Sequence, residues 1–262
     1  MALTAAALNV VLGLVYISYG TMTLIEMVRD KDTRGFSHFG AAWIAIVFTC
    51  GAHHWVHGLH IGFEGRSVGA LDLIAVMVGF PAAAVWFVLR AEAFAGGRGD
   101  RFVPGSPLWV LALPTILGVY LTALVAATLG VGGLHLESGA LPVILPNLLI
   151  LGLYSAIGYF LARTQLANRK PLGGWSLSGI ALALVLPTCG LMHGVYALYA
   201  LSGKYVLDYH GFVIDWFAVP AAVYFLWVVH GLYKGTFRDW NGAPPKLADN
   251  PRPVTSVGTA PA

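Results

Sequence analysis

Residues Thr49–His60 read TCGAHHWVHGLH and place four histidines and a cysteine inside an apolar run. That run is long enough to cross the hydrocarbon core of a bilayer, which takes roughly 20 apolar residues. Much further along the chain, Thr188–His193 reads TCGLMH, again inside an apolar run. Both stretches contain the pattern Thr-Cys-Gly-x-x-His, and their cysteines are the only two in the protein. We therefore expect the rest of the chain to bring these two stretches together.

The composition is that of a helical membrane protein. Of the 262 residues, 58% are hydrophobic and only 10% are charged, whereas soluble domains average about 25% charged residues. Long apolar runs recur along the chain and predict an all-α fold with seven transmembrane helices in one domain over residues 1–236. The predicted spans are residues 4–27, 38–62, 68–91, 107–130, 141–164, 174–201 and 210–234.

Lysine and arginine are distributed unevenly among the predicted loops. Basic residues follow the first, third, fifth and seventh spans, whereas the opposite loops hold only Arg66 and Lys204. The positive-inside rule then predicts an integral plasma (inner) membrane protein with its N-terminus outside and its C-terminus cytoplasmic. The tail over residues 242–262 is rich in proline and polar residues and is predicted to be disordered.

The net charge also limits the kinds of binding partner that the sequence predicts. The formal net charge of +3 comes from loop residues, so the sequence predicts no nucleic-acid surface. The expected surroundings are the lipid bilayer and, beyond it, a homo-oligomer or a larger membrane complex.

The chain repeats itself with an offset of 139 residues. His54 and His193 are separated by this offset, and so are Pro81 and Pro220, which begin the segments PAAAVWFVL and PAAVYFLWV. Upstream, NVVLGLVYISYG from Asn9 aligns with NLLILGLYSAIG from Asn147 after a shift of one residue. We therefore predict two three-helix repeats, about residues 5–91 and 143–234, joined by a linker helix over residues 107–130. Because one helix lies between them, both repeats enter the membrane from the same side and have the same orientation.

This 3+1+3 parallel pseudo-repeat resembles the layout of the SWEET sugar-transporter and PQ-loop families. The resemblance covers architecture alone, because the first and fifth predicted spans contain no Pro-Gln pair. It implies transport of a small solute but carries over no substrate residues. Rhodopsins also have seven spans, yet the last span here has no lysine in mid-membrane that could hold retinal, since Lys234 falls at its end.

The paired motifs suggest a metal or haem centre between the second and sixth spans. Cys50 and His54 are four residues apart, as are Cys189 and His193, so each pair lies on one helix face. Two cysteines and two histidines form a complete tetrahedral set for zinc, and thiolate and imidazole also suit copper and iron. Alternatively, His54 and His193 alone could be the paired axial ligands of a haem b. The cysteines also fit a purely structural role, because small residues pack where membrane helices approach closely.

Further ligands are predicted on the same side of the membrane. His53 and His57 extend the histidine face toward the outer surface, and His210 and Asp215 begin the seventh span. Ionisable groups at membrane depth are costly and usually functional. The full set of predicted metal ligands is Cys50, His53, His54, His57, Cys189, His193, His210 and Asp215.

Two functions of different class follow from this sequence. The first is an integral membrane protein that binds a transition metal (zinc, copper or iron) or haem in its outer half, for redox chemistry, metal-dependent catalysis or metal handling. The second is a small-solute or proton-coupled transporter in which the histidines bind the substrate or protons. The sequence shows no phosphate-binding loop, dinucleotide fingerprint or nucleophile elbow.

Overall fold

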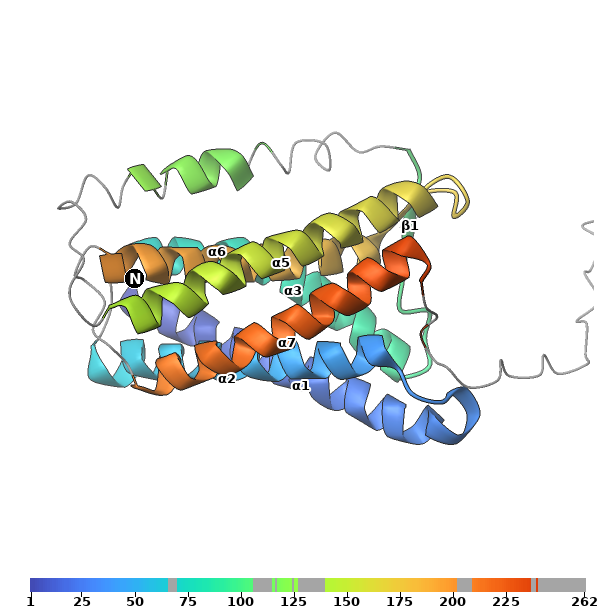
Figure 1. The fold of residues 1–262 in the computed structure, drawn as a ribbon, viewed down its shortest axis with the longest axis horizontal. Coiled ribbons are helices and arrows are strands. Elements are labelled where there is room, and N and C mark those ends of the chain that lie inside the picture. The colour runs from blue at the N-terminus through green and yellow to red at the C-terminus, as the bar shows by residue number, and fades with distance from the viewer. Residues whose placement is uncertain are drawn as a thin grey trace, which may run out of the picture.

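In the part of the chain that the structure describes, six long helices lie side by side in an elongated bundle (Figure 1). The computed structural model describes residues 1–65, 70–105, 115, 117–123, 125–126, 140–201, 209–236 and 239. The helices are α1 (Ala2–Arg34), α2 (His38–Glu64), α3 (Ala70–Phe94), α5 (Leu141–Asn168), α6 (Leu177–Leu201) and α7 (Tyr209–Lys234).

Each of these helices is long and apolar enough to cross a membrane. The prediction of a mostly helical protein with helices suited to a lipid bilayer is therefore confirmed. The predicted span over residues 107–130 falls largely outside the described residues, and the predicted tail over 242–262 falls entirely outside them. A count of seven spans and a disordered tail stay predictions.

The helices differ from the predicted spans mainly at the end of the bundle away from the N-terminus. Helix α1 continues to Arg34 instead of ending near residue 27, and its polar extension carries an Asp30 carboxylate paired with Arg29 and Arg34. A short antiparallel pair, β1 (Phe102–Val103) and β2 (Trp175–Ser176), also lies at this end and was not predicted. Each strand has only two residues, which is too short for an alternating hydrophobic pattern to be recognised in the sequence.

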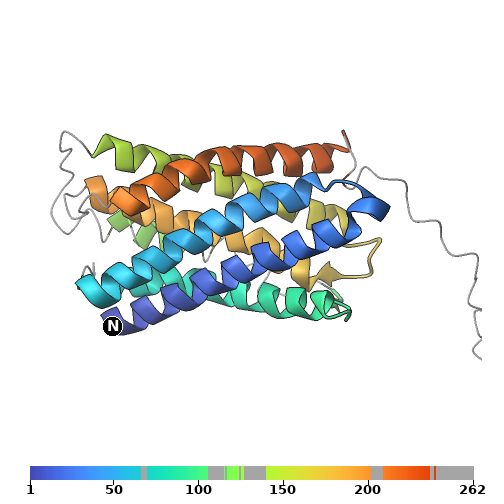
Figure 2. The ribbon, with the colours of Figure 1, turned by 90° about the horizontal axis from the view of Figure 1, so that it is seen from below.

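Helix packing follows a matched pattern in the two halves of the chain. Helix α1 packs against α2 and α3, just as α5 packs against α6 and α7, and the halves meet where α2 contacts α7 and α3 contacts α6. Helices α1, α3, α5 and α7 run in one direction along the bundle, while α2 and α6 run in the other (Figures 1 and 2). The bundle therefore places the N-terminus, the ends of α2 and α6 and the starts of α3, α5 and α7 at one end.

Glycine allows α1 and α2 to pack at short distance. A Cβ atom added to Gly51 would lie 3.0 Å from the Gly13 carbonyl oxygen and 2.8 Å from Ile17 Cγ1. Small residues of this kind let membrane helices bring their backbones together. Deeper in the bundle, large buried side chains such as Tyr16, Trp43 and Phe225 fill the space between helices.

Candidate metal centre

Three buried side chains from three helices form a group that could hold a metal ion. His53 of α2, His193 of α6 and Asp215 of α7 each offer one ligand atom, and these atoms lie within 4.8 Å of one another. The Asp215 Oδ1 atom lies 2.9 Å from His53 Nδ1 and 3.7 Å from His193 Nδ1. Ligands of a tetrahedral zinc ion with bonds of about 2.0–2.1 Å are about 3.3 Å apart. The 2.9 Å between Asp215 Oδ1 and His53 Nδ1 is close to this spacing.

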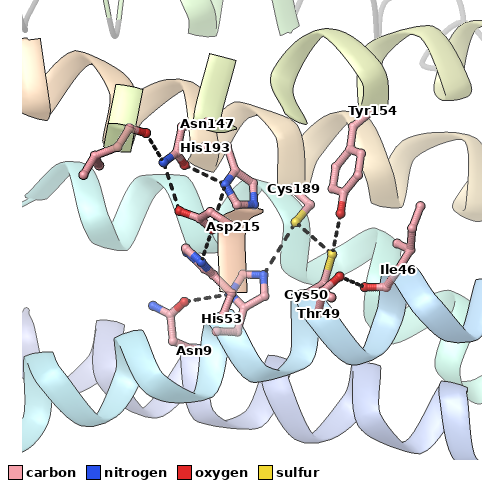
Figure 3. Close-up of polar contacts among 12 residues, drawn as sticks. Asn9, Ile46, Thr49, Cys50, His53, Asn147, Tyr154, Cys189, His193 and Asp215 are labelled. Carbon is pink, nitrogen blue, oxygen red and sulfur yellow. Dashed lines mark hydrogen bonds and ion pairs between the residues drawn. The ribbon is translucent and has the colours of Figure 1, made fainter. Parts of the chain in front are cut away.

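Asn147 of α5 fixes the orientation of two members of this group (Figure 3). Its side-chain nitrogen donates to the Val143 carbonyl at 2.8 Å and to Asp215 Oδ2 at 2.9 Å, and both of these oxygens can only accept. The amide oxygen must therefore face His193 Nδ1, 2.7 Å away, and Nδ1 must carry the hydrogen. A neutral His193 then presents the lone pair of Nε2, the arrangement that outer hydrogen bonds impose on metal-binding histidines.

Asn9 of α1 holds His54 in the same way. The Asn9 side-chain nitrogen donates to the Ala5 carbonyl at 2.9 Å, which turns its oxygen toward His54 Nδ1, also at 2.9 Å. His54 thus donates through Nδ1, and its Nε2 lies 3.9 Å from Cys189 Sγ. His54 is only 1% exposed and its ring stacks on Tyr16. Its hydrogen-bonding groups thus face α1 and Cys189, and its ring meets only the edge of the neighbouring His53 ring, with centroids 6.2 Å apart.

The two cysteines meet between α2 and α6. Cys50 Sγ and Cys189 Sγ lie 3.7 Å apart, both thiols are free, and Tyr154 Oη lies 3.1 Å from Cys50 Sγ. The structure therefore brings the two Thr-Cys-Gly-x-x-His stretches together. The predicted haem has no support in this arrangement, because His54 and His193 are hydrogen-bonded to different helices, α1 and α5, and His54 Nε2 faces Cys189 Sγ.

The remaining histidines of α2 lead from the buried group toward the nearer end of the bundle. The ring of His57 stacks near that of His53, and its Nε2 lies 4.0 Å from Asp72 Oδ1. His60 Nδ1 lies 3.1 Å from Glu64 Oε2, on a carboxylate that is 46% exposed. Side-chain exposure along α2 is thus 6% at His53, 14% at both His57 and His60, and 46% at Glu64 in the last turn.

The outcome for the predicted ligands is uneven. His53, His193 and Asp215 gather in one group, whereas His54, Cys50 and Cys189 lie in a neighbouring cluster, and His57 lies beyond His53. The His210 side chain falls outside the described residues, so its role stays a prediction. Asn9 and Asn147, both fully buried, were missed as site residues, although the repeat alignment paired them.

No protein-family model, curated protein or solved structure matches this chain.

Proposed function

We propose that this protein is a membrane metalloprotein that binds one divalent transition metal ion through His53, His193 and Asp215. The observation that carries the proposal is the burial of these side chains, each at most 6% exposed, with ligand atoms within 4.8 Å. Imidazole and carboxylate groups inside a bilayer are costly unless they are paired or bind an ion. A bound cation would satisfy all three at once.

The ligand set favours zinc, iron or another borderline metal and an open coordination position. Two histidines and one carboxylate are the ligands of many catalytic zinc sites and of non-haem iron sites, where water or substrate occupies the remaining positions. The cysteine sulfurs are not in this group, so the Cys₂His₂ set predicted from the motifs is not the one we propose. Metal-dependent catalysis is the role that an open position supports best, ahead of metal handling or simple electron transfer.

The position of the centre in the bundle suggests the side from which metal, water and substrate reach it. The centre lies in the half of the bundle that contains the N-terminus, which the distribution of basic residues predicts to be the outer half. His57 and His60 lie between the centre and the outer end of α2. We propose that metal, water and substrate reach the centre from outside along this face.

Cobalt binding tests the proposal directly. Purified protein in detergent would be stripped of metal, titrated with Co(II) and followed by visible absorption, and elemental analysis would identify the native metal. Alanine at His53 or His193, or asparagine at Asp215, should weaken binding by more than the roughly 10–100-fold that outer hydrogen-bond partners contribute. His60→Ala is the matched control and should bind normally. Unchanged Co(II) affinity in all three ligand variants would refute the site.

The alternative is a small-solute transporter built from the two three-helix repeats. The matched packing of α1–α3 and α5–α7 supports it, as does a cavity of about 270 Å³ at the opposite end of the bundle. That cavity is lined by an ion pair between Glu26 and Arg90 and by the rings of Trp43 and Trp86. Metal-free protein that takes up a solute into vesicles in response to a proton gradient would favour this function over the first.

A further inference from the structure

The two cysteines form a second cluster that the proposed metal centre does not use. Cys50 and Cys189 are 2% and 3% exposed, and their sulfur atoms are in van der Waals contact at 3.7 Å. They come from different helices, α2 and α6, and each side chain is 139 residues from its counterpart. No other cysteine exists in the chain to compete for either thiol.

Two further donors point at this pair of thiols. Tyr154 Oη lies 3.1 Å from Cys50 Sγ, within hydrogen-bonding distance of a sulfur atom. His54 Nε2 lies 3.9 Å from Cys189 Sγ, and Asn9 keeps the hydrogen of His54 on Nδ1, so Nε2 directs a lone pair toward the sulfur. The cluster therefore combines two soft sulfur ligands, one imidazole nitrogen and one hydroxyl in an apolar interior.

We propose that Cys50 and Cys189 form a separate site for a soft monovalent metal ion, Cu(I). Two metal–sulfur bonds of about 2.3 Å allow sulfur atoms to lie up to about 4.6 Å apart. The observed 3.7 Å falls within that limit, so the two sulfur atoms are close enough for one ion to bridge both thiolates in a bent arrangement. Sulfur ligands select Cu(I) over the harder metals that suit histidine and carboxylate.

Binding at this site is a proton exchange without electron transfer. Cu⁺ forms two Cu–S bonds and the two thiols lose their protons, giving a bis-thiolate complex with one negative charge and two released protons. The Tyr154 hydroxyl can donate to the Cys50 thiolate, and His54 Nε2 on the Cys189 side can be the third ligand after the two sulfur atoms. The site shares no ligand with His53, His193 and Asp215, so it stands independently of the proposed function.

The test is a competition for Cu(I) under anaerobic conditions. Full-length protein in detergent would be reduced with a phosphine, freed of reductant and mixed with the coloured Cu(I)–bicinchoninate complex, and bleaching would measure the copper withdrawn. Wild type should withdraw one Cu(I) per chain, and Cys50→Ser and Cys189→Ser should each lose this capacity. The matched control is Asp215→Asn, which removes a ligand of the other centre and should withdraw copper normally.

Two readouts keep a folding defect separate from a lost site. Both serine variants should still bind Co(II) as wild type does, which shows that their bundle is intact. Cu(I) loading should add ultraviolet thiolate-to-copper absorption in wild type and in Asp215→Asn, but in neither serine variant. The proposal is overturned if the reduced wild type withdraws no copper, or if the double variant lacking both thiols withdraws as much. If the wild type binds Cu(I) but not Co(II), the divalent metal centre of the proposed function is refuted and the Cu(I) site is not.

Discussion

Replacing Asn147 with alanine isolates the role of the residue that orients the metal ligands. The substitution removes hydrogen bonds of 2.7 Å to His193 Nδ1, 2.9 Å to Asp215 Oδ2 and 2.8 Å to the Val143 carbonyl. The carbonyl keeps its place in the α5 helix, so the histidine N–H and the carboxylate oxygen are the groups left unsatisfied. Each buried unsatisfied group costs about 1–3 kcal/mol, and Asp215 retains His53, so we expect a loss of about 2–4 kcal/mol in stability.

The same substitution should weaken the metal centre without removing a ligand. Outer partners of metal-binding histidines contribute about 10–100-fold to affinity, which is about 1.4–2.8 kcal/mol. Asn9→Ala is the matched control, because it removes the equivalent bond to His54 Nδ1 and the bond to the Ala5 carbonyl. It should cost about 1–3 kcal/mol in stability, yet leave Co(II) affinity within a few-fold of wild type.

Two measurements on the same samples decide this prediction. Co(II) titration reports the affinity of the centre, and loss of helical circular dichroism on heating reports stability in detergent. The reasoning predicts that both variants melt earlier and that only Asn147→Ala loses affinity. Equal loss of affinity in the two variants would show that any damage to the bundle weakens binding, and unchanged affinity in both would show that Asn147 orients no ligand.

Three further predictions concern the fold and its orientation. Burial raises the pKa of Asp100, but hydrogen bonds from Ser176 and from the Ser178 backbone outweigh it and lower the pKa overall. The ionised Asp100 carboxylate should therefore stabilise the fold fully above the unfolded pKa of about 3.9, and this stabilisation should vanish as the pH falls through the lower folded value. Asp100→Asn should remove this acid dependence of the melting temperature. Gly51→Ala should destabilise by about 1–3 kcal/mol because the new methyl meets an immovable carbonyl, whereas Gly62→Ala, whose Cβ would make an ordinary 3.5 Å contact, should melt as wild type does. A C-terminal tag should be reached by antibody only after cells are permeabilised, and labelling of intact cells would reverse the proposed orientation.

The sequence predicted the helices well because long apolar runs have no other stable form in a bilayer. It predicted a site between α2 and α6 with His54 and His193 as central ligands, whereas the group proposed above contains His53, the neighbour of His54, beside His193. Successive helical residues point about 100° apart, and α2 packs against both α1 and α7. His53 faces Asp215 on α7, while His54 faces Asn9 on α1. Which histidine faces which helix depends on the rotation of α2 about its axis, and the sequence motif does not determine that rotation. The asparagines were overlooked because they carry no charge and ligate nothing themselves.

The predicted repeat bears on the number of divalent sites that the chain can form. Asn9, His54 and Cys50 have counterparts of the same type in the second half of the chain, and these residues form the hydrogen-bonded frame and the thiol pair. Two of the three residues in the metal group differ between the halves: by the offset of 139 residues, His53 corresponds to Met192 and Asp215 to Val76, whereas His193 corresponds to His54. Met192 and Val76 are buried and apolar, so they supply neither an imidazole nor a carboxylate. A symmetric pair of divalent sites is therefore not expected, and elemental analysis should find one divalent metal ion per chain.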